Sequence, residues 1–436
     1  MSNIEIAFVM LGLMLLLIYA GMHVAVALTL LSFIGVWWIK GDPTIASSLL
    51  AQAASDAIAS HIFGVVPLFV LMGFLVAIAD IGRDSFEVAN RLFRRVRGGL
   101  GIATVAANAV FAAITGISIA SAAVFTRVAV PEMLRFGYKP RFAVGVVAGS
   151  SVLGMLIPPS LLMILYGFLS EQSVGSLFLA GIIPGILLSL AYSLYIVAAS
   201  FWAPDYVGGQ QSGEAGGPRL SIGEIATKMF PIAGLIFLVL GGIYGGWFTA
   251  TDGGAVGALG ALAIALWRRK LTWRKFWQVL VETGHVTVSV SFLIIAANIF
   301  TRMLALSGMP QYLVQAMATA GFGFYGFLAV YIMMVLVLGT IIDSSSIMLI
   351  VLPLMLPVAA SFGVDLIWFG VITVVAVEIG LLTPPFGLSV YVIKSTLNDP
   401  RISLGDIFAG TMPFALIMLL VLLLLIIFPN FSLMLL

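Results

Sequence analysis

Long stretches of this chain carry no charged side chain, and this constrains the fold more than any other feature. The stretch between Glu5 and Lys40 contains no Lys, Arg, Asp or Glu. Over the whole chain, 62% of residues are hydrophobic and only 9% are charged, whereas an ordinary soluble domain is about 25% charged. A soluble core of this length would leave too little polar surface to face water. We therefore expect an all-α polytopic membrane protein, because in lipid a helix satisfies its own backbone.

Charge and cysteine content exclude several function classes. The net charge is +2 and no broad basic patch is present, which argues against a nucleic-acid partner. The chain has no cysteine, so disulfides, thiolate chemistry and Cys-ligated metals are excluded. The apolar N-terminal stretch is too long for a cleavable signal and lacks a basic segment before it. It is long enough for two helices joined near Gly21.

A spanning helix needs about 20 apolar residues. The sequence predicts ten spans, near 5–20, 23–39, 60–80, 142–168, 177–201, 229–247, 250–267, 279–303, 366–393 and 408–428.

Two further apolar regions, 98–133 and 323–361, are too long for one span, and each has a small, polar, glycine-containing centre. Basic residues flank the first on both sides, and basic loops are typically cytoplasmic. The second lies in a stretch without Lys or Arg that runs from Arg302 to Lys394. We interpret them as re-entrant hairpins that enter from the cytoplasm and the periplasm, respectively. The alternative is two ordinary spans in each region.

The tendency of basic loops to be cytoplasmic also places both termini on the periplasmic side of a bacterial inner membrane. It also predicts a cytoplasmic linker at 202–228, which contains Gly208, Gly209, Gly216, Gly217 and Pro218.

The two halves of the chain share landmarks at nearly one offset. Gly154 and the pair Pro158-Pro159 recur, in the same spacing, as Gly380 and Pro384-Pro385. The hairpin centres Gly116 and Gly339 are separated by almost the same interval. Because the hairpins open to opposite sides, the repeats are predicted to be inverted, as in many secondary transporters. The first repeat is 1–201, with scaffold helices in 5–80, hairpin 98–133 and broken helix 142–168. The second is 229–436, with scaffold helices in 229–303, hairpin 323–361 and broken helix 366–393.

Each Pro-Pro pair should break its helix, because proline removes a backbone donor and clashes with the preceding turn. The freed carbonyls are tolerated in a membrane where they line a cavity or hold a cation. The hairpin tips add hydroxyls, and hydroxyl and carbonyl oxygens suit a hard cation such as sodium. The half-helix N-termini at the tips would attract an anionic substrate. A simple kink and close helix packing are the alternatives. The tip hydroxyls are those of Ser118, Ser121, Thr340, Ser344, Ser345 and Ser346.

Ionisable residues inside predicted spans are functional candidates. For Glu378 and Asp343 we favour a structural or ion-pathway role over direct substrate contact, since a carboxylate repels an acidic substrate. Arg127 is a candidate substrate-contacting residue together with Ser121 and Ser345, although a buried ion pair would explain Arg127 equally well. Arg302 should reach the membrane interface. The three histidines are scattered and predict no metal site.

The order of short motifs along the chain resembles the large, DctM-like membrane subunit of TRAP (tripartite ATP-independent periplasmic) transporters. The resemblance covers nearly the whole chain. It is carried by Pro67–Gly73 (PLFVLMG), Arg97–Leu100 (RGGL), Pro131–Met133 (PEM), Leu156–Ser160 (LIPPS), Phe178–Gly185 (FLAGIIPG), Gly242–Thr249 (GIYGGWFT) and Gly380–Gly387 (GLLTPPFG).

This resemblance implies a function and partners. Such subunits import organic acids (dicarboxylates, sialic acids, keto acids or sugar acids) by an elevator mechanism driven by a sodium gradient. A periplasmic binding protein delivers the substrate, and a small four-helix membrane subunit braces the large one. Sodium is the coupling ion, and no organic cofactor or enzymatic activity is implied. The family's ion sites lie between each tip and the neighbouring break. Here those positions are Gly116, Ser118, Gly154, Pro158, Thr340, Ser344, Gly380, Thr383 and Pro384.

Two other functions remain open from the sequence. One is a stand-alone ion-coupled anion permease of the same superfamily. The other is an intramembrane serine protease, because Gly116 and Ser118 form a Gly-x-Ser pattern. A protease would need a histidine within hydrogen-bond reach of the serine, and His61 and His285 fall near the ends of predicted spans.

Overall fold

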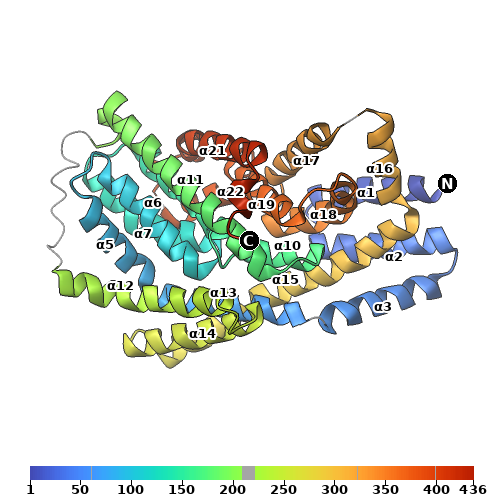
Figure 1. Cartoon of the computed structure of the whole chain (residues 1–436), viewed down its shortest axis with the longest axis horizontal. Coiled ribbons are helices and arrows are strands. Elements are labelled where there is room, and N and C mark those ends of the chain that lie inside the picture. Colours follow the sequence, from blue (N-terminus) through green and yellow to red (C-terminus); the bar gives the residue numbers. More distant parts are fainter. Residues whose placement is uncertain (60, 209–220, 322, 398) are drawn as a thin grey trace.

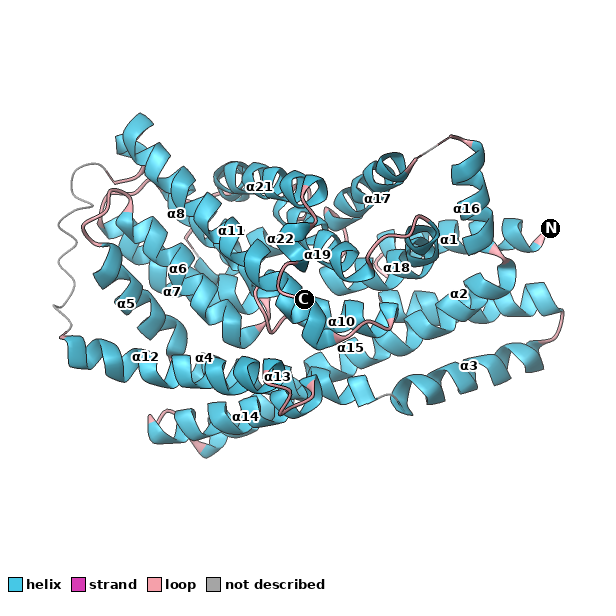
Figure 2. Ribbon diagram, viewed as in Figure 1, coloured by secondary structure: helices cyan, strands magenta, loops and turns pink. Residues whose placement is uncertain are grey.

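The computed structural model describes residues 1–59, 61–208, 221–321, 323–397 and 399–436 (Figure 1). This part of the chain is helical, with one isolated β-bridge between Tyr138 and Val207 and no extended strand (Figure 2). The expected all-α membrane fold is confirmed. By length and composition, seven described helices can cross a membrane, or up to eight if one bent pair is a single span. Several further apolar helices are 10–17 residues long.

The elements of the first half are α1 (Asn3–Tyr19), α2 (Val24–Lys40), α3 (Pro43–Ala59), η1 (His61–Gly64), α4 (Val65–Ile78), α5 (Ile81–Phe93), α6 (Gly99–Thr115), α7 (Ser118–Arg135), α8 (Pro140–Ser151), α9 (Leu153–Leu156), α10 (Leu161–Ser170), α11 (Val174–Trp202) and η2 (Pro204–Tyr206). Those of the second half are α12 (Ile222–Ile236), η4 (Phe237–Gly241, a π-helical turn), α13 (Gly242–Tyr244), α14 (Ala250–Trp267), α15 (Trp273–Ser307), α16 (Met309–Thr319), α17 (Phe324–Gly339), α18 (Ser344–Ser361), α19 (Leu366–Leu382), α20 (Leu388–Leu397), α21 (Leu404–Ile427) and α22 (Asn430–Leu433).

Both regions expected to form hairpins are pairs of helices joined by short tips. Helices α6 and α7 meet at Gly116 and Ile117, and α17 and α18 meet at residues 340–343. Gly116 adopts the left-handed conformation, with φ of +63°, which glycine reaches without steric cost. Helix α18 is by itself long and apolar enough to be a span. Both predicted helix breaks are also present: Ile157–Ser160 separates α9 from α10, and Thr383–Gly387 separates α19 from α20.

Several helices were not predicted. Helix α3 is rich in Ala and Ser, α5 is amphipathic and carries four charged residues, and α16 is short. None of these patterns resembles a long apolar run. The predicted linker 202–228 was too long, because α12 begins at Ile222, where Ser221 and Glu224 form a capping box. Of the linker glycines and proline named above, Gly209, Gly216, Gly217 and Pro218 lie outside the described residues.

The helices pack in two groups. In the first, the 35-residue α15 lies against α2, α3 and α4, and α4 lies against α14. Figure 1 shows α12, α14 and α3 along the lower edge of the view, with α15 above α3. In the second group, α8 packs against α7 and α21, α20 against α7, and α17 against α19. The groups meet where α4 and α5 contact α6 and where α15 contacts α18.

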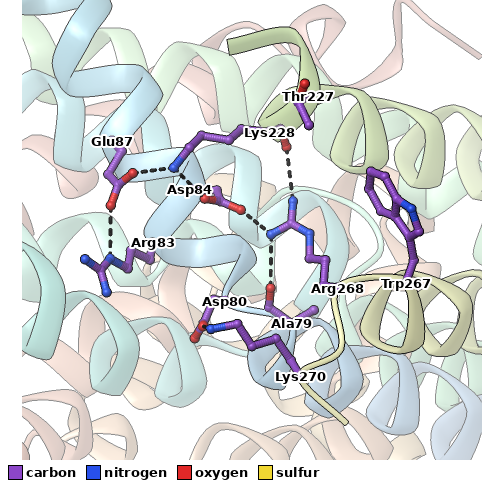
Figure 3. Close-up of a pocket in the computed structure, with 10 residues that line it drawn as sticks. All are labelled: Ala79, Asp80, Arg83, Asp84, Glu87, Thr227, Lys228, Trp267, Arg268 and Lys270. Atoms are coloured by element: carbon purple, nitrogen blue, oxygen red, sulfur yellow. Dashed lines mark hydrogen bonds and ion pairs between the residues drawn. The ribbon is translucent and has the colours of Figure 1, made fainter. Parts of the chain in front are cut away.

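A bend of 61° separates α4 from α5, and ion pairs hold it (Figure 3). The Arg268 guanidinium, at the end of α14, donates to the Ala79 carbonyl at 3.1 Å and to the Asp84 carboxylate. Lys228 of α12 pairs with Asp84 at 2.9 Å and also with Glu87. These groups line a pocket of about 510 Å³. Its basic side chains are paired with acidic ones, so its main role is to join α5 to α12 and α14.

Replacing Arg268 with Ala should lower the melting temperature of the purified protein. The substitution leaves Asp84, whose side chain is only 15% exposed, with one cationic partner instead of two. We expect a loss of about 1–3 kcal/mol, since a mostly buried charge loses a charge-assisted hydrogen bond. Arg274→Ala, at an exposed position of α15, is the matched control. Equal melting temperatures for the two variants would contradict this role of Arg268.

Candidate ion and substrate site

The first hairpin tip is pressed against the first helix break. A Cβ atom at Gly116 would collide with the Pro159 carbonyl oxygen, and one at Gly154 would lie 3.0 Å from the Ser118 amide nitrogen. A side chain at either position would therefore require the backbone to shift. The amide of Leu161, just after the break, donates to the Gly116 carbonyl at 3.2 Å. The predicted neighbours Gly116, Ser118, Gly154 and Pro158 are thus brought together at one place.

The second tip meets the second break in a similar way. A Cβ atom at Gly339 would lie 2.7 Å from the Gly380 Cα, so these two backbones touch. The Phe386 amide donates to the Thr340 carbonyl at 3.1 Å. In both halves, an amide that follows the broken helix binds a carbonyl at a hairpin tip. Small residues are what allow helices in a membrane to approach this closely.

The hydroxyls of the two threonines are already engaged as donors. Thr340 donates to the Val337 carbonyl at 2.8 Å, and Thr383 donates to the Ile379 and Gly380 carbonyls at 2.9 and 2.8 Å. Each keeps lone pairs that could face a cation. Asp343 caps α18, since its carboxylate accepts from the Ser346 amide at 3.1 Å and from the Ser346 hydroxyl at 2.5 Å. This supports the structural role considered for Asp343.

Glu378 lies between the two tips. It is fully buried on α19, and its Oε1 accepts a hydrogen bond from the Ser344 hydroxyl at 3.3 Å. The hydroxyl of Ser118, from the other hairpin, also lies close enough to interact with this carboxyl, although it makes no well-aligned hydrogen bond. The sequence marked Glu378 as an ionisable residue in a span, but did not place it among the ion-site residues or predict that both tips face it.

Several oxygens of Glu378 and of helices α7 and α20 are buried without a hydrogen-bond partner. They include Glu378 Oε2 and the hydroxyls of Ser118 and Ser121, which lie one turn apart on α7. The Ser389 hydroxyl of α20, a helix that packs on α7, is buried and unpartnered as well. Buried polar groups in proteins are normally paired. The unpaired Glu378 Oε2 and the unpaired Ser118 hydroxyl beside it fit the requirements of a hard cation.

The two breaks differ in their surroundings. Pro158 and Pro159 are buried or nearly so, whereas Pro384 and Pro385 are exposed. The second break and its tip also carry exposed apolar side chains: Phe386 is 50% exposed and Ile341 is 43% exposed. The first break is therefore enclosed by protein, and the second has an open side.

The structure places the remaining candidates as follows. Ser121 is fully buried, Ser345 is partly exposed, and Arg127 is exposed. Arg127 is nine residues beyond Ser118 on α7, about 13 Å along the helix, so it is not part of the oxygen cluster. Arg302, expected to reach the membrane interface, forms an ion pair with Asp56 of α3 at 2.5 Å, which the sequence did not predict. The sequence missed this pair because it missed α3.

The predicted protease arrangement is not formed among the described side chains. Ser118 faces the Glu378 carboxyl and His285 lies on α15, while the side chain of the other candidate, His61, lies outside those described. Helix α7 packs mainly against α5, α6, α8 and α20 instead.

Paired helical hairpins packed on broken helices in an apolar bundle define a membrane transport protein. A solved structure with a similar fold is that of the YdaH transporter of Alcanivorax borkumensis, with a TM-score of 0.59 and 14% identity over 88% of each chain. At this identity the likeness concerns the fold alone.

Sequence comparison is more specific. Residues 11–431 match the family described as "Tripartite ATP-independent periplasmic transporter, DctM component". The C4-dicarboxylate TRAP transporter large permease protein of Pseudomonas aeruginosa is 35% identical over 374 residues, which is 84% of each chain. The sialic acid TRAP transporter large permease protein of Vibrio cholerae is 31% identical and covers 96% of each chain. The chain therefore belongs to the DctM family of large TRAP transporter permeases, which are transporters and not enzymes.

A methyl group at Gly380 should disrupt the contact between tip and break. In the Gly380→Ala variant the new Cβ would lie 2.6 Å from the Gly339 Cα, and backbone cannot yield as a flexible side chain can. We expect a destabilisation of about 1–3 kcal/mol, which is typical of overpacking, measured as a lower melting temperature in detergent. Gly234→Ala is the control, because a Cβ at Gly234 of α12 would meet open space. A Gly380→Ala protein as stable as Gly234→Ala would disprove the close contact.

Proposed function

We propose that this chain is the large subunit of a sodium-gradient-driven transporter that imports an organic acid. The observation that carries the proposal is the contact of each hairpin tip with a broken helix. These contacts gather carbonyl and hydroxyl oxygens inside an apolar bundle. Such oxygens are suitable ligands for a hard cation such as sodium. The proposed sodium ligands remain those predicted from the sequence, around Gly116 and Ser118 in the first half and Thr340 and Ser344 in the second.

We further propose that the two halves are inverted repeats and that transport proceeds by an elevator motion. The matching tip–break contacts, with their similar offsets in sequence, support the repeat of 1–201 in 229–436. The two packing groups support a moving part and a fixed part, with α15 and α14 in the fixed one. Ions bound at the tips would stiffen the moving part before it crosses the membrane.

The substrate proposed is an organic acid. The relatives named above carry C4-dicarboxylates and sialic acid, according to their names, and both are carboxylates. Helices α7 and α18 begin at the tips with Ser118 and Ser344. The N-terminus of a helix attracts an anion through its free amides and its dipole. Ser121, Ser345 and Arg127 remain proposed substrate contacts, of which only Ser345 and Arg127 have exposed surface in this conformation.

The proposed partners are a periplasmic binding protein and a small membrane subunit of four helices. Membership of a tripartite family supports both. Large apolar side chains on α12, η4, α14 and α15 are exposed, and they would face either lipid or the small subunit. They include Phe230, Phe237, Leu259, Trp267, Trp277 and Val288. The inner membrane is the proposed location, with both termini in the periplasm.

Uptake by the complex in proteoliposomes should require sodium outside, the small subunit and the cognate binding protein. Dissipating the sodium gradient at constant membrane potential should abolish accumulation of the acid, because the gradient supplies the free energy. Radiolabelled substrate measures the uptake, and external potassium in place of sodium is the control. Accumulation that continues without sodium and needs ATP would overturn the proposal. Accumulation without any binding protein would instead favour a stand-alone permease.

Removing either tip hydroxyl should lower the apparent affinity for sodium while the protein still folds. We expect Ser118→Ala and Ser344→Ala each to raise the sodium concentration for half-maximal uptake by about tenfold, the effect of losing one interaction with a charged group. Ser47→Ala, at an exposed position of α3, should leave this concentration unchanged. If both tip variants keep the sodium dependence of the unmodified protein, the assignment of these residues is wrong.

A further inference from the structure

Glu378 is the one charged side chain that is fully buried among the described residues; every other residue in this buried polar set is Ser, Thr or Asn. It lies on α19, four residues before that helix ends at the second break. An isolated carboxylate costs several kcal/mol to bury, so a buried charge is normally paired. No Lys, Arg or His in the described part of the chain forms an ion pair with Glu378.

Its polar surroundings come from both hairpins. Ser344 of the second tip donates to Oε1, while Oε2 has no partner. Ser118 of the first tip faces the same carboxyl, and the Ser118 hydroxyl has no hydrogen-bond partner. Both serines occupy the first position of an 18-residue helix. Two helix N-termini therefore lie beside Glu378, and helix N-termini attract negative charge. They account for part of the buried charge but satisfy neither Oε2 nor the Ser118 hydroxyl.

A small cation would satisfy these groups. The unpartnered oxygens at this carboxyl include Oε2 of Glu378 and the hydroxyl of Ser118, and the unpartnered hydroxyl of Ser121 lies one helical turn further along α7. Carboxylate and hydroxyl oxygens select hard cations, and one carboxylate balances one positive charge. The described residues contain no group of three or more His, Cys, Asp or Glu that would indicate a transition metal. A monovalent ion fits this donor set best.

We propose that Glu378 is the acidic ligand of a sodium site shared by the two hairpin tips, with Ser118 and Ser344 on either side of the carboxylate. This inference rests on the proposed sodium coupling and extends it, because the two ion positions predicted from the sequence become linked through one charge. The carboxylate can face both serines only when both tips are packed on α19 and α9. Sodium bound at Glu378 therefore holds the two hairpins together, and occupancy at one tip assists occupancy at the other.

The test is sodium-dependent thermal stabilisation of the purified protein in detergent, with potassium keeping the ionic strength constant. The unmodified protein should melt at higher temperature as sodium increases. Glu378→Gln keeps the size and hydrogen-bonding capacity of the side chain but removes its charge. We expect this variant to raise the sodium concentration at half-maximal stabilisation about tenfold or more, because one charged ligand is lost. The dependence of melting temperature on sodium concentration should also become less steep. Without sodium, it should melt no lower than the unmodified protein, since it removes an uncompensated buried charge.

Glu282→Gln, on α15, is the matched control and should respond to sodium as the unmodified protein does. If Glu378→Gln cannot be purified, Glu378→Asp takes its place. This variant keeps the charge but withdraws it from the serines. We expect it to raise the sodium concentration at half-maximal stabilisation by less than Glu378→Gln does.

The outcomes separate the two proposals. No stabilisation of the unmodified protein by sodium would overturn sodium coupling itself, and this site with it. Stabilisation that is equal in the unmodified protein and in the Glu378 variant would leave sodium coupling standing and overturn the role of Glu378.

Discussion

Contact between backbone atoms, with no side chain in between, is the constraint on which the rest of this structure depends. At Gly339 and Gly380 two helices touch through their Cα atoms, and Gly116 and Gly154 allow the same approach between the first tip and its break. Prolines remove donors from the broken helices, and in each half an amide that follows the Pro-Pro pair binds a tip carbonyl. Each tip therefore fixes the position of a break, and each break fixes a tip.

This mutual positioning has a chemical consequence at Glu378. A buried carboxylate near the end of α19 would be costly if the surrounding helices were continuous and apolar. Because both tips end beside it, it meets two helix N-termini and two serine hydroxyls. The same glycines that bring backbones together thus create the polar interior on which the proposed sodium coupling rests. This polar interior is small and lies within a large apolar core.

Much of the fold can be predicted from sequence because its signals are strong: long apolar runs, two Pro-Pro pairs and glycine-containing tips. The long helices, both hairpins and both breaks follow from them. Helices α3 and α5 could not be predicted by the same criteria, since α3 is rich in small residues and α5 is amphipathic. For the site, the residues near each break were predictable individually. The sequence could not predict that Ser118 and Ser344, from opposite halves of the chain, face one carboxyl. That arrangement depends on how the two hairpins pack together around α19.

Helix α15 also determines how this protein can sit in a bilayer. Its 35 residues give a length of about 52 Å, whereas the hydrocarbon core is about 30 Å thick. Hydrophobic mismatch of this size requires a strong tilt or a projecting end. The first turns of α15 carry Trp273, Arg274 and Trp277 on exposed surface, which is the composition of a headgroup-level girdle. Because α2, α3 and α4 pack on α15, the depth at which this helix matches the bilayer also determines their depth.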